Sequence, residues 1–139
     1  MSEPVLRISP KKYSGETTIV SMRMSKDLRA SLAIAQKYGI KRDRIMLDPG
    51  VGFGKTREQN LTVMNHLEDI VAMGYPVLLG ASRKSVIGLT LDLPVDEREE
   101  GTIATSVIGA MKGCQFVRVH DVKKNVRALR MADAIRKEH

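Results

Sequence analysis

The stretch RIMLDPGVGFGKT, residues 44–56, contains in order the parts of one strand–loop–helix unit. Its first residues form a short apolar run that predicts a buried β-strand, and the alternating glycines that follow predict a loop. Thr56 begins an S/T-x-x-E/Q pattern that ends at Gln59, which is the signature of a capped helix start. A strand, a loop and a helix in this order are typical of parallel α/β folds.

The same order of apolar run, loop and amphipathic helix repeats along the chain from about residue 17. The predicted strands are residues 17–24, 44–48, 76–80 and 115–119. Gly39, Gly74 and Gly113 are each expected to end the predicted helix that precedes it in the sequence. We therefore expect residues 1–16 to be an irregular leader and residues 17–139 to be one α/β domain with a parallel sheet.

Apolar residues recur at helical spacing in each predicted helix, and we expect them to form the core. They are Leu28, Leu32, Ala35, Leu61, Met64, Leu67, Val71, Ile103, Ala104, Val107, Ile108, Met111, Val126, Leu129, Ala132 and Ile135. Met22 and Met24 are likewise interpreted as packing residues.

Composition narrows the class of protein. A chain of 139 residues can form one domain with a sizeable core. It has no apolar run of the roughly 20 residues that span a bilayer and no signal-peptide core, so we expect a cytoplasmic protein with no membrane partner. The net charge of +7 is interleaved with acids, and aromatic residues are few, which favours a small anionic substrate over a nucleic acid. The single cysteine, Cys114, is interpreted as a buried structural thiol.

The Gly-Lys-Thr ending of the opening stretch resembles a nucleotide-binding P-loop, but the spacing excludes this reading. G-x-x-x-x-G-K-[ST] requires a glycine at position 49, which is Pro49. The dinucleotide pattern G-x-G-x-x-G requires a glycine at position 55, which is Lys55. The loop therefore needs another function.

Polar residues follow three of the predicted strands at the point where each strand ends. These residues are Asp48, then Ser82, Arg83 and Lys84, then Arg118 and His120. In parallel α/β folds the carboxyl ends of the strands meet at one rim, and that rim carries the ligand site. We therefore expect these side chains to converge on one pocket.

Each of these groups also has a purely structural interpretation. Asp48 precedes Pro-Gly and is either a turn-capping residue or a buried carboxylate that binds paired N–H donors. The Ser82–Lys84 segment is either a solvated basic turn or an anion site. For residues 118–121 the structural interpretation is that Asp121 caps the last helix and His120 lies at the surface. The functional interpretation is that Arg118 and His120, as alternate residues of one strand, point together into the rim. His66 and His139 are interpreted as exposed or structural.

Three motifs in order, LDPGVGFGKT, LLGASRKS and FVRVHDV, together resemble dihydropteroate synthase, an enzyme family of folate biosynthesis. The resemblance is clearest over residues 44–139 and extends to EQNL and LDLPVDEREEGT. It implies the carboxyl-terminal half of a TIM-type (β/α)8 barrel. It also implies an enzyme that joins p-aminobenzoate to 6-hydroxymethyl-7,8-dihydropterin diphosphate and releases pyrophosphate.

The resemblance also implies roles for individual residues. Asp48, Phe53, Gly80, Lys84 and Arg118 match pterin-binding positions, and Ser82 matches the hydroxyl near the p-aminobenzoate carboxylate. Arg118 and His120 match the pair that holds the diphosphate. Lys84, Arg118 and His120 are the expected catalytic residues, acting by positioning and electrostatics.

A full barrel needs about 250 residues, so the chain is expected to be a partial barrel with weak or no activity alone. The resemblance implies Mg²⁺ as cofactor, with its protein ligand in the missing amino-terminal half and no metal ligand here. The expected partners are a second copy of the chain or a complementing amino-terminal half. The alternatives are a pterin-binding or assembly module without turnover and a pterin-dependent methyltransferase half-barrel.

Overall fold

The structure is a computed structural model that describes residues 6–8 and 17–138, and side chains from residue 24 onward. Parallel strands alternate with helices, as predicted. The strands are β1 (Leu6–Ile8), β2 (Ile45–Leu47), β3 (Leu78–Leu79) and β4 (Phe116–Val117). The helices are α1 (Thr17–Lys37), α2 (Arg57–Asn65), α3 (Leu67–Val71), α4 (Ser85–Leu91), α5 (Glu99–Met111) and α6 (Val122–Lys137), with 3₁₀ turns at Arg42–Arg44 and Val95–Glu97.

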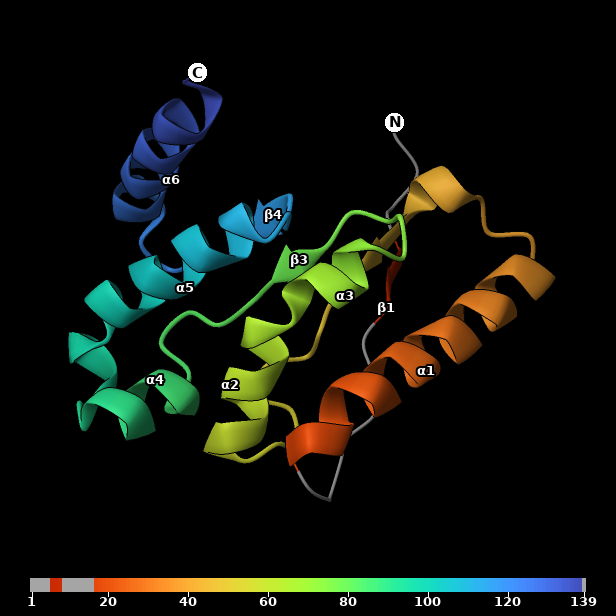
Figure 1. Cartoon of the computed structure of the whole chain (residues 1–139), viewed down its shortest axis with the longest axis horizontal. Helices are drawn as coiled ribbons and strands as arrows, with labels where there is room; N and C mark the ends of the chain where they lie inside the picture. The colour runs from red at the N-terminus through yellow and green to blue at the C-terminus, as the bar shows by residue number, and fades with distance from the viewer. Residues whose placement is uncertain (1–5, 9–16, 139) are drawn as a thin grey trace.

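The described strands lie side by side in the order of the sequence. β1 pairs in parallel with β2, and β3 pairs in parallel with β4. A parallel bridge between Leu47 and Val77 joins the two pairs, and the Leu47 amide donates a 2.8 Å hydrogen bond to the Pro76 carbonyl. Figure 1 shows the helices around these strands, with α1 at one side of the view and α6 at the other.

Two predictions about the amino-terminal region were wrong. Residues 17–24, predicted as a strand, are the first two turns of α1. Met24 and Leu28, four residues apart, are both fully buried, so helical periodicity outweighs the β-branched start of this segment. Residues 6–8, placed in the irregular leader, form β1. The other residues of that leader lie outside the described part of the chain.

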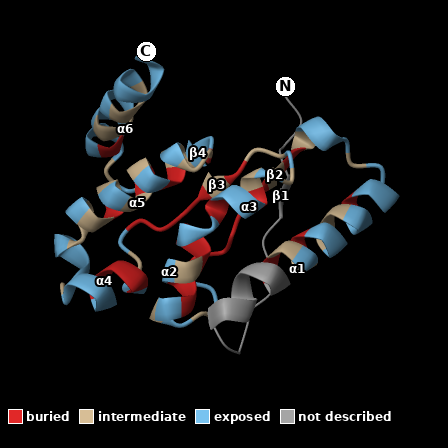
Figure 2. Cartoon of the chain, in the orientation of Figure 1, coloured by how far each residue is buried: buried red, intermediate tan, exposed pale blue. Residues whose placement is uncertain are grey.

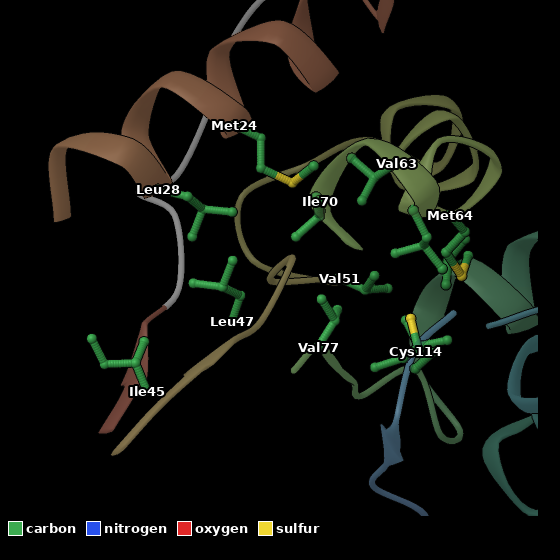
Figure 3. Packing of buried hydrophobic residues seen from close by; sticks show 14 of the residues in the cluster. Met24, Leu28, Ile45, Leu47, Val51, Val63, Met64, Ile70, Val77 and Cys114 are labelled. Carbon is green, nitrogen blue, oxygen red and sulfur yellow. The ribbon is translucent and has the colours of Figure 1, made fainter. Parts of the chain in front are cut away.

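The core lies between the strands and helices α1, α2 and α3. Figure 3 shows Leu28, Leu47, Val51 and Val77 packed together, with Cys114 at the β4 side. The prediction of a buried Cys114 is confirmed, because its side chain is only 7% exposed. Met24 and Met64 are also buried as predicted, whereas the side chain of Met22 is not described.

The prediction that the apolar stripes of α5 and α6 are core was wrong in several places. Ile108, Met111, Val126 and Ile135 are all exposed, and Leu61 of α2 is exposed as well. Figure 2 shows α6 as mostly exposed or intermediate. Among the described elements α6 packs mainly against α5, so only one side of this helix is covered.

Candidate functional site

The register between β3 and β4 brings two pairs of predicted residues together. Leu78 pairs with Phe116 and Leu79 with Val117, an offset of 38 residues. The same offset continues beyond the strand ends and places Ser82 opposite His120. Gly80 faces Arg118 at the same offset, and the Arg118 amide donates a 2.9 Å hydrogen bond to the Leu79 carbonyl.

Ser82 and His120 are joined by two hydrogen bonds. The Ser82 Oγ lies 2.7 Å from Nδ1 of the His120 ring, and it accepts the His120 backbone N–H at 3.2 Å. Because Oγ already accepts one proton from the backbone, its own hydroxyl proton is available for Nδ1 of a neutral ring. In that tautomer the Nε2–H is the remaining donor of His120.

The guanidinium of Arg118 lies against Gly80. A Cβ placed on Gly80 would come within 2.8 Å of Nη2 and 3.3 Å of Cζ of Arg118. Gly80 is buried, and its φ is not in the left-handed region, so a side chain here would displace the Arg118 guanidinium without straining the backbone.

Asp48 is buried at the carboxyl end of β2, where it organises the glycine loop. Its Oδ1 accepts the Gly50 backbone N–H at 2.7 Å, so the turn-capping interpretation is confirmed for this oxygen. The next glycine, Gly52, donates its N–H to Oδ1 of Asn60 at 2.9 Å. Asn60 lies on α2, is only 2% exposed and was missed by the sequence analysis.

Lys84 links the loop after β3 to the glycine loop after β2. Its Nζ donates to the Val51 carbonyl and lies 5.1 Å from the centre of the Phe53 ring. Its Cδ passes so close to Gly52 that a Cβ there would lie 2.9 Å away. Gly52 also has a φ of +87°, which disfavours other residues. Phe53 itself is 47% exposed beside this contact.

These contacts join three strand ends into one polar rim, and comparison with known proteins identifies the family. The model for pterin-binding enzymes matches residues 6–120 of the chain. The chain belongs to the dihydropteroate synthase and pterin-binding enzyme family. The match starts at β1, well before residue 44, where the motif resemblance becomes clear.

Curated dihydropteroate synthases are similar to most of the chain, but the chain spans only about 40% of the length of the two relatives that follow. It is 62% identical over 110 residues to that of Clostridium beijerinckii, covering 78% of this chain and 41% of the relative. The Bacillus subtilis enzyme is 54% identical over 112 residues, covering 81% and 39%.

Solved structures of the family are similar to the fold of this chain over nearly its whole length. The enzyme of Clostridium difficile, solved in the presence of pteroic acid, has a TM-score of 0.85 at 42% identity, over 96% of this chain and 51% of that one. The enzyme of Coxiella burnetii, in complex with pteroic acid, has a TM-score of 0.89 at 35% identity, over 96% and 53%.

Within this family fold, the electrostatics of the rim involve a further lysine. Burial lowers the pKa of Lys55, the nearby Asp48 carboxylate raises it, and the positive charge of Lys84 lowers it. Lys55 Nζ donates to the Gly50 carbonyl at 2.8 Å, so this bond connects the end of the glycine loop to its beginning. Asp48, Lys55 and Lys84 are therefore electrostatically coupled at one rim.

Several smaller predictions are confirmed in the same region. Thr56 and Gln59 form a capping box with both reciprocal bonds at the start of α2. Asp121 caps α6 by accepting the Lys124 N–H at 3.0 Å, and this bond is the main cause of its lowered pKa. His66 is exposed, whereas His139 lies outside the described residues.

Two further observations concern ligands and membranes. A hollow lined by Ala110, Cys114 and Leu129 lies between α5 and α6 at the amino end of β4, away from the polar rim. Among residues 6–8 and 17–138, no group of three or more His, Cys, Asp or Glu side chains could hold a metal ion. In the same part of the chain, no helix is both long and apolar enough to cross a membrane.

Proposed function

We propose that the chain is the carboxyl-terminal half of a dihydropteroate synthase barrel. In this proposal the described strands correspond to the last four of a (β/α)8 barrel, and their carboxyl ends form one wall of a pterin pocket. The observation that carries the proposal is the continuous rim from Asp48 through Lys84 to the Gly80–Arg118 and Ser82–His120 pairs.

The proposed reaction joins p-aminobenzoate to 6-hydroxymethyl-7,8-dihydropterin diphosphate. The amine of p-aminobenzoate forms a bond to the exocyclic methylene carbon, the bond from that carbon to the diphosphate oxygen breaks, and the amine loses a proton. Negative charge grows on the leaving diphosphate, so a guanidinium and N–H donors held in place beside it lower the barrier. Arg118 and His120 are assigned to this role.

The remaining rim residues are assigned to substrate binding. The carboxylate of Asp48 would pair with N–H donors of the pterin, and its burial strengthens such a pairing. Phe53 would lie against the flat ring, and Lys84 is close enough to reach a ligand at the same place. Gly80 leaves room for Arg118, and Ser82 would bind the p-aminobenzoate carboxylate.

Mg²⁺ enters this proposal only through the family. The family resemblance, and not the described residues, assigns the ion's protein ligand to the amino-terminal half. Turnover would then require that half as a partner, with a second copy of the chain as the other proposed partner.

Calorimetry with pteroic acid, followed by a turnover assay, tests the proposal. We expect the chain to bind pteroic acid, and Asp48→Asn to weaken binding by at least about tenfold because it removes a charge from a buried hydrogen-bonding site. Asp43→Asn is the matched control, since Asp43 is exposed at the amino end of the same strand. We expect it to bind like the unmodified chain.

Turnover of the dihydropterin diphosphate is measured with the chain alone and after adding the part of the Bacillus subtilis enzyme that the chain does not match. Product only in the mixture supports the proposed half-barrel. A normal enzyme rate from the chain alone contradicts the need for a second half. Binding without product under both conditions favours a pterin-binding module, and no binding refutes both readings.

A further inference from the structure

The loop between Ser82 and Lys84 contains an unusual backbone conformation. Arg83, between the two, has a φ of +57°, and among the described residues Asp92 is the other non-glycine residue with a positive φ. This region is unfavourable for residues with a Cβ, so surrounding contacts must hold it in place. Those contacts come from side chains that the sequence analysis did not single out.

Both backbone polar groups of Arg83 are bound by side chains at the start of α5. Its N–H donates to Oγ1 of Thr102 at 3.0 Å, and its carbonyl accepts from Nη1 of Arg98 at 2.9 Å. Arg98 is itself held by its Nε, which donates to the Leu93 carbonyl at 3.1 Å, and by its close approach to Gly88. Thr102 is completely buried.

A second set of contacts connects the same loop to the loop that carries His120. Asn125 of α6, only 1% exposed, donates through Nδ2 to Oε1 of Glu99 and to the Asp121 carbonyl, both at 2.8 Å. Its Oδ1 accepts the Ser106 hydroxyl, also at 2.8 Å. The other oxygen of Glu99 lies 3.8 Å from Nε of Arg83.

These side chains form one group, which we call the support cluster: Arg98, Glu99, Thr102 and Asn125. The cluster contacts the loop after β3 on one side and the loop after β4 on the other. The Ser82–His120 hydrogen bonds join these two supported loops, and Lys84 extends from the first of them to the Val51 carbonyl in the glycine loop after β2. Burying polar side chains is unfavourable unless they are hydrogen-bonded. Here Thr102 and Arg98 bond the Arg83 backbone in the loop after β3, and Asn125 bonds the Asp121 carbonyl in the loop after β4.

We propose that Arg98, Thr102 and Asn125 are positioning residues that hold the Ser82–Lys84 loop and the His120 loop in register. Thr102 holds Arg83 in the left-handed conformation, which directs Ser82 toward His120 and Lys84 toward the glycine loop. Asn125 holds Asp121 and, through Glu99, the side chain of Arg83. The expected effect on pteroic acid affinity rests on the proposed function, whereas the expected effects on the Arg83 amide and the His120 ring do not.

Thr102→Val is the primary test, because it keeps the shape of the side chain and removes the acceptor of the Arg83 N–H. Thr105→Val is the matched control on the same helix, since its hydroxyl donates to the Thr102 carbonyl within α5. Thr102→Ser keeps the hydroxyl and is the rescue variant. Amide hydrogen exchange at Arg83 and the ¹⁵N shifts of the His120 ring are measured by NMR, and pteroic acid affinity by calorimetry.

In Thr102→Val we expect exchange at the Arg83 amide to accelerate by about tenfold or more, the His120 ring shifts to change, and pteroic acid affinity to fall by about tenfold. Thr105→Val and Thr102→Ser are expected to match the unmodified chain in all three measurements. Unchanged exchange at Arg83 and unchanged His120 shifts in Thr102→Val overturn the inference. Equal changes in Thr105→Val overturn it too, because they indicate a general effect on α5.

Arg98→Lys provides a second variant in case Thr102→Val does not fold. Arg98 is only partly buried, and lysine keeps the charge but cannot bond the Arg83 and Leu93 carbonyls together. We expect faster exchange at the Lys84 amide, which closes the turn onto the Ala81 carbonyl at 3.2 Å. If exchange there is unchanged, the inference fails. If the unmodified chain does not bind pteroic acid, the proposed function fails and the NMR measurements still decide the role of the cluster.

Discussion

Replacing Gly80 with alanine tests the rim at its closest contact. The added Cβ would lie 2.8 Å from Nη2 of Arg118, whereas ordinary contact begins at 3.4 Å. The guanidinium must therefore move by about 0.6 Å or more, the difference between these two distances. Nothing else needs to move much, because Gly80 has an ordinary φ and the atoms that it meets are the end of a flexible side chain.

The expected effect is on anion binding and not on folding. A hydrogen bond between charged groups contributes about 1.5–3 kcal/mol, so displacing the guanidinium from a bound diphosphate should weaken pyrophosphate binding by about 10- to 100-fold. The free energy of unfolding should change by less than about 1 kcal/mol, since an alanine at a compatible φ is tolerated. Pyrophosphate affinity is measured by calorimetry and stability by urea denaturation.

Gly39→Ala is the matched control with the opposite expectation. Gly39 has a φ of +74°, and a Cβ added there would meet no atom within 4 Å, so alanine strains only the backbone. We expect a loss of roughly 1 kcal/mol of stability with unchanged pyrophosphate affinity. If Gly80→Ala binds pyrophosphate as tightly as the unmodified chain, Arg118 does not hold the anion in the proposed way.

Two further predictions concern stability and thiol chemistry. Thr56→Ala removes the hydroxyl that accepts the Gln59 N–H at the start of α2, and it should lower the free energy of unfolding, measured by urea denaturation, by about 1 kcal/mol. Thr56→Ser keeps the hydroxyl and should lose much less stability. Equal losses in the two variants would show that the hydroxyl is not the cause. Burial raises the pKa of Cys114 to about 11 from 9.0, so the folded state holds its proton more tightly than the unfolded state. The contribution of the Cys114 thiol to the free energy of unfolding should be fully present below pH 9 and decline as the pH rises toward 11, and Cys114→Ala should lack this decline. At about pH 8 the folded protein should react with a thiol reagent only as fast as it unfolds. Rapid reaction of the folded protein would contradict the burial of Cys114.

Much of the fold could be predicted because its signals are local. The capping box at Thr56, the cap at Asp121 and the glycines that end helices each depend on a few neighbouring residues, and the structure has them where the sequence predicts them. The alternation of strands and helices is also local, since it follows from the period of the apolar residues. Gly39, Gly74 and Gly113 all have a positive φ, as the ends of helices require.

The errors arose where distant residues decide the outcome. Residues 6–8 look like part of a leader, and only parallel pairing with Ile45–Leu47 makes them a strand. The apolar stripe of α6 has the right period for a core, but whether it is buried depends on which elements cover it, and period alone does not contain that information.

By itself, the sequence determined which residues can form the rim: an acid, a hydroxyl and several cations, each placed directly after an apolar run. Tertiary structure alone decided how they are arranged. The offset of 38 residues pairs Ser82 with His120, and Thr102 and Asn125 support the two loops from buried positions on helices. The physical reason is that a strand end or a cap is set by neighbouring residues, whereas a hydrogen bond between two loops exists only after the strands have paired.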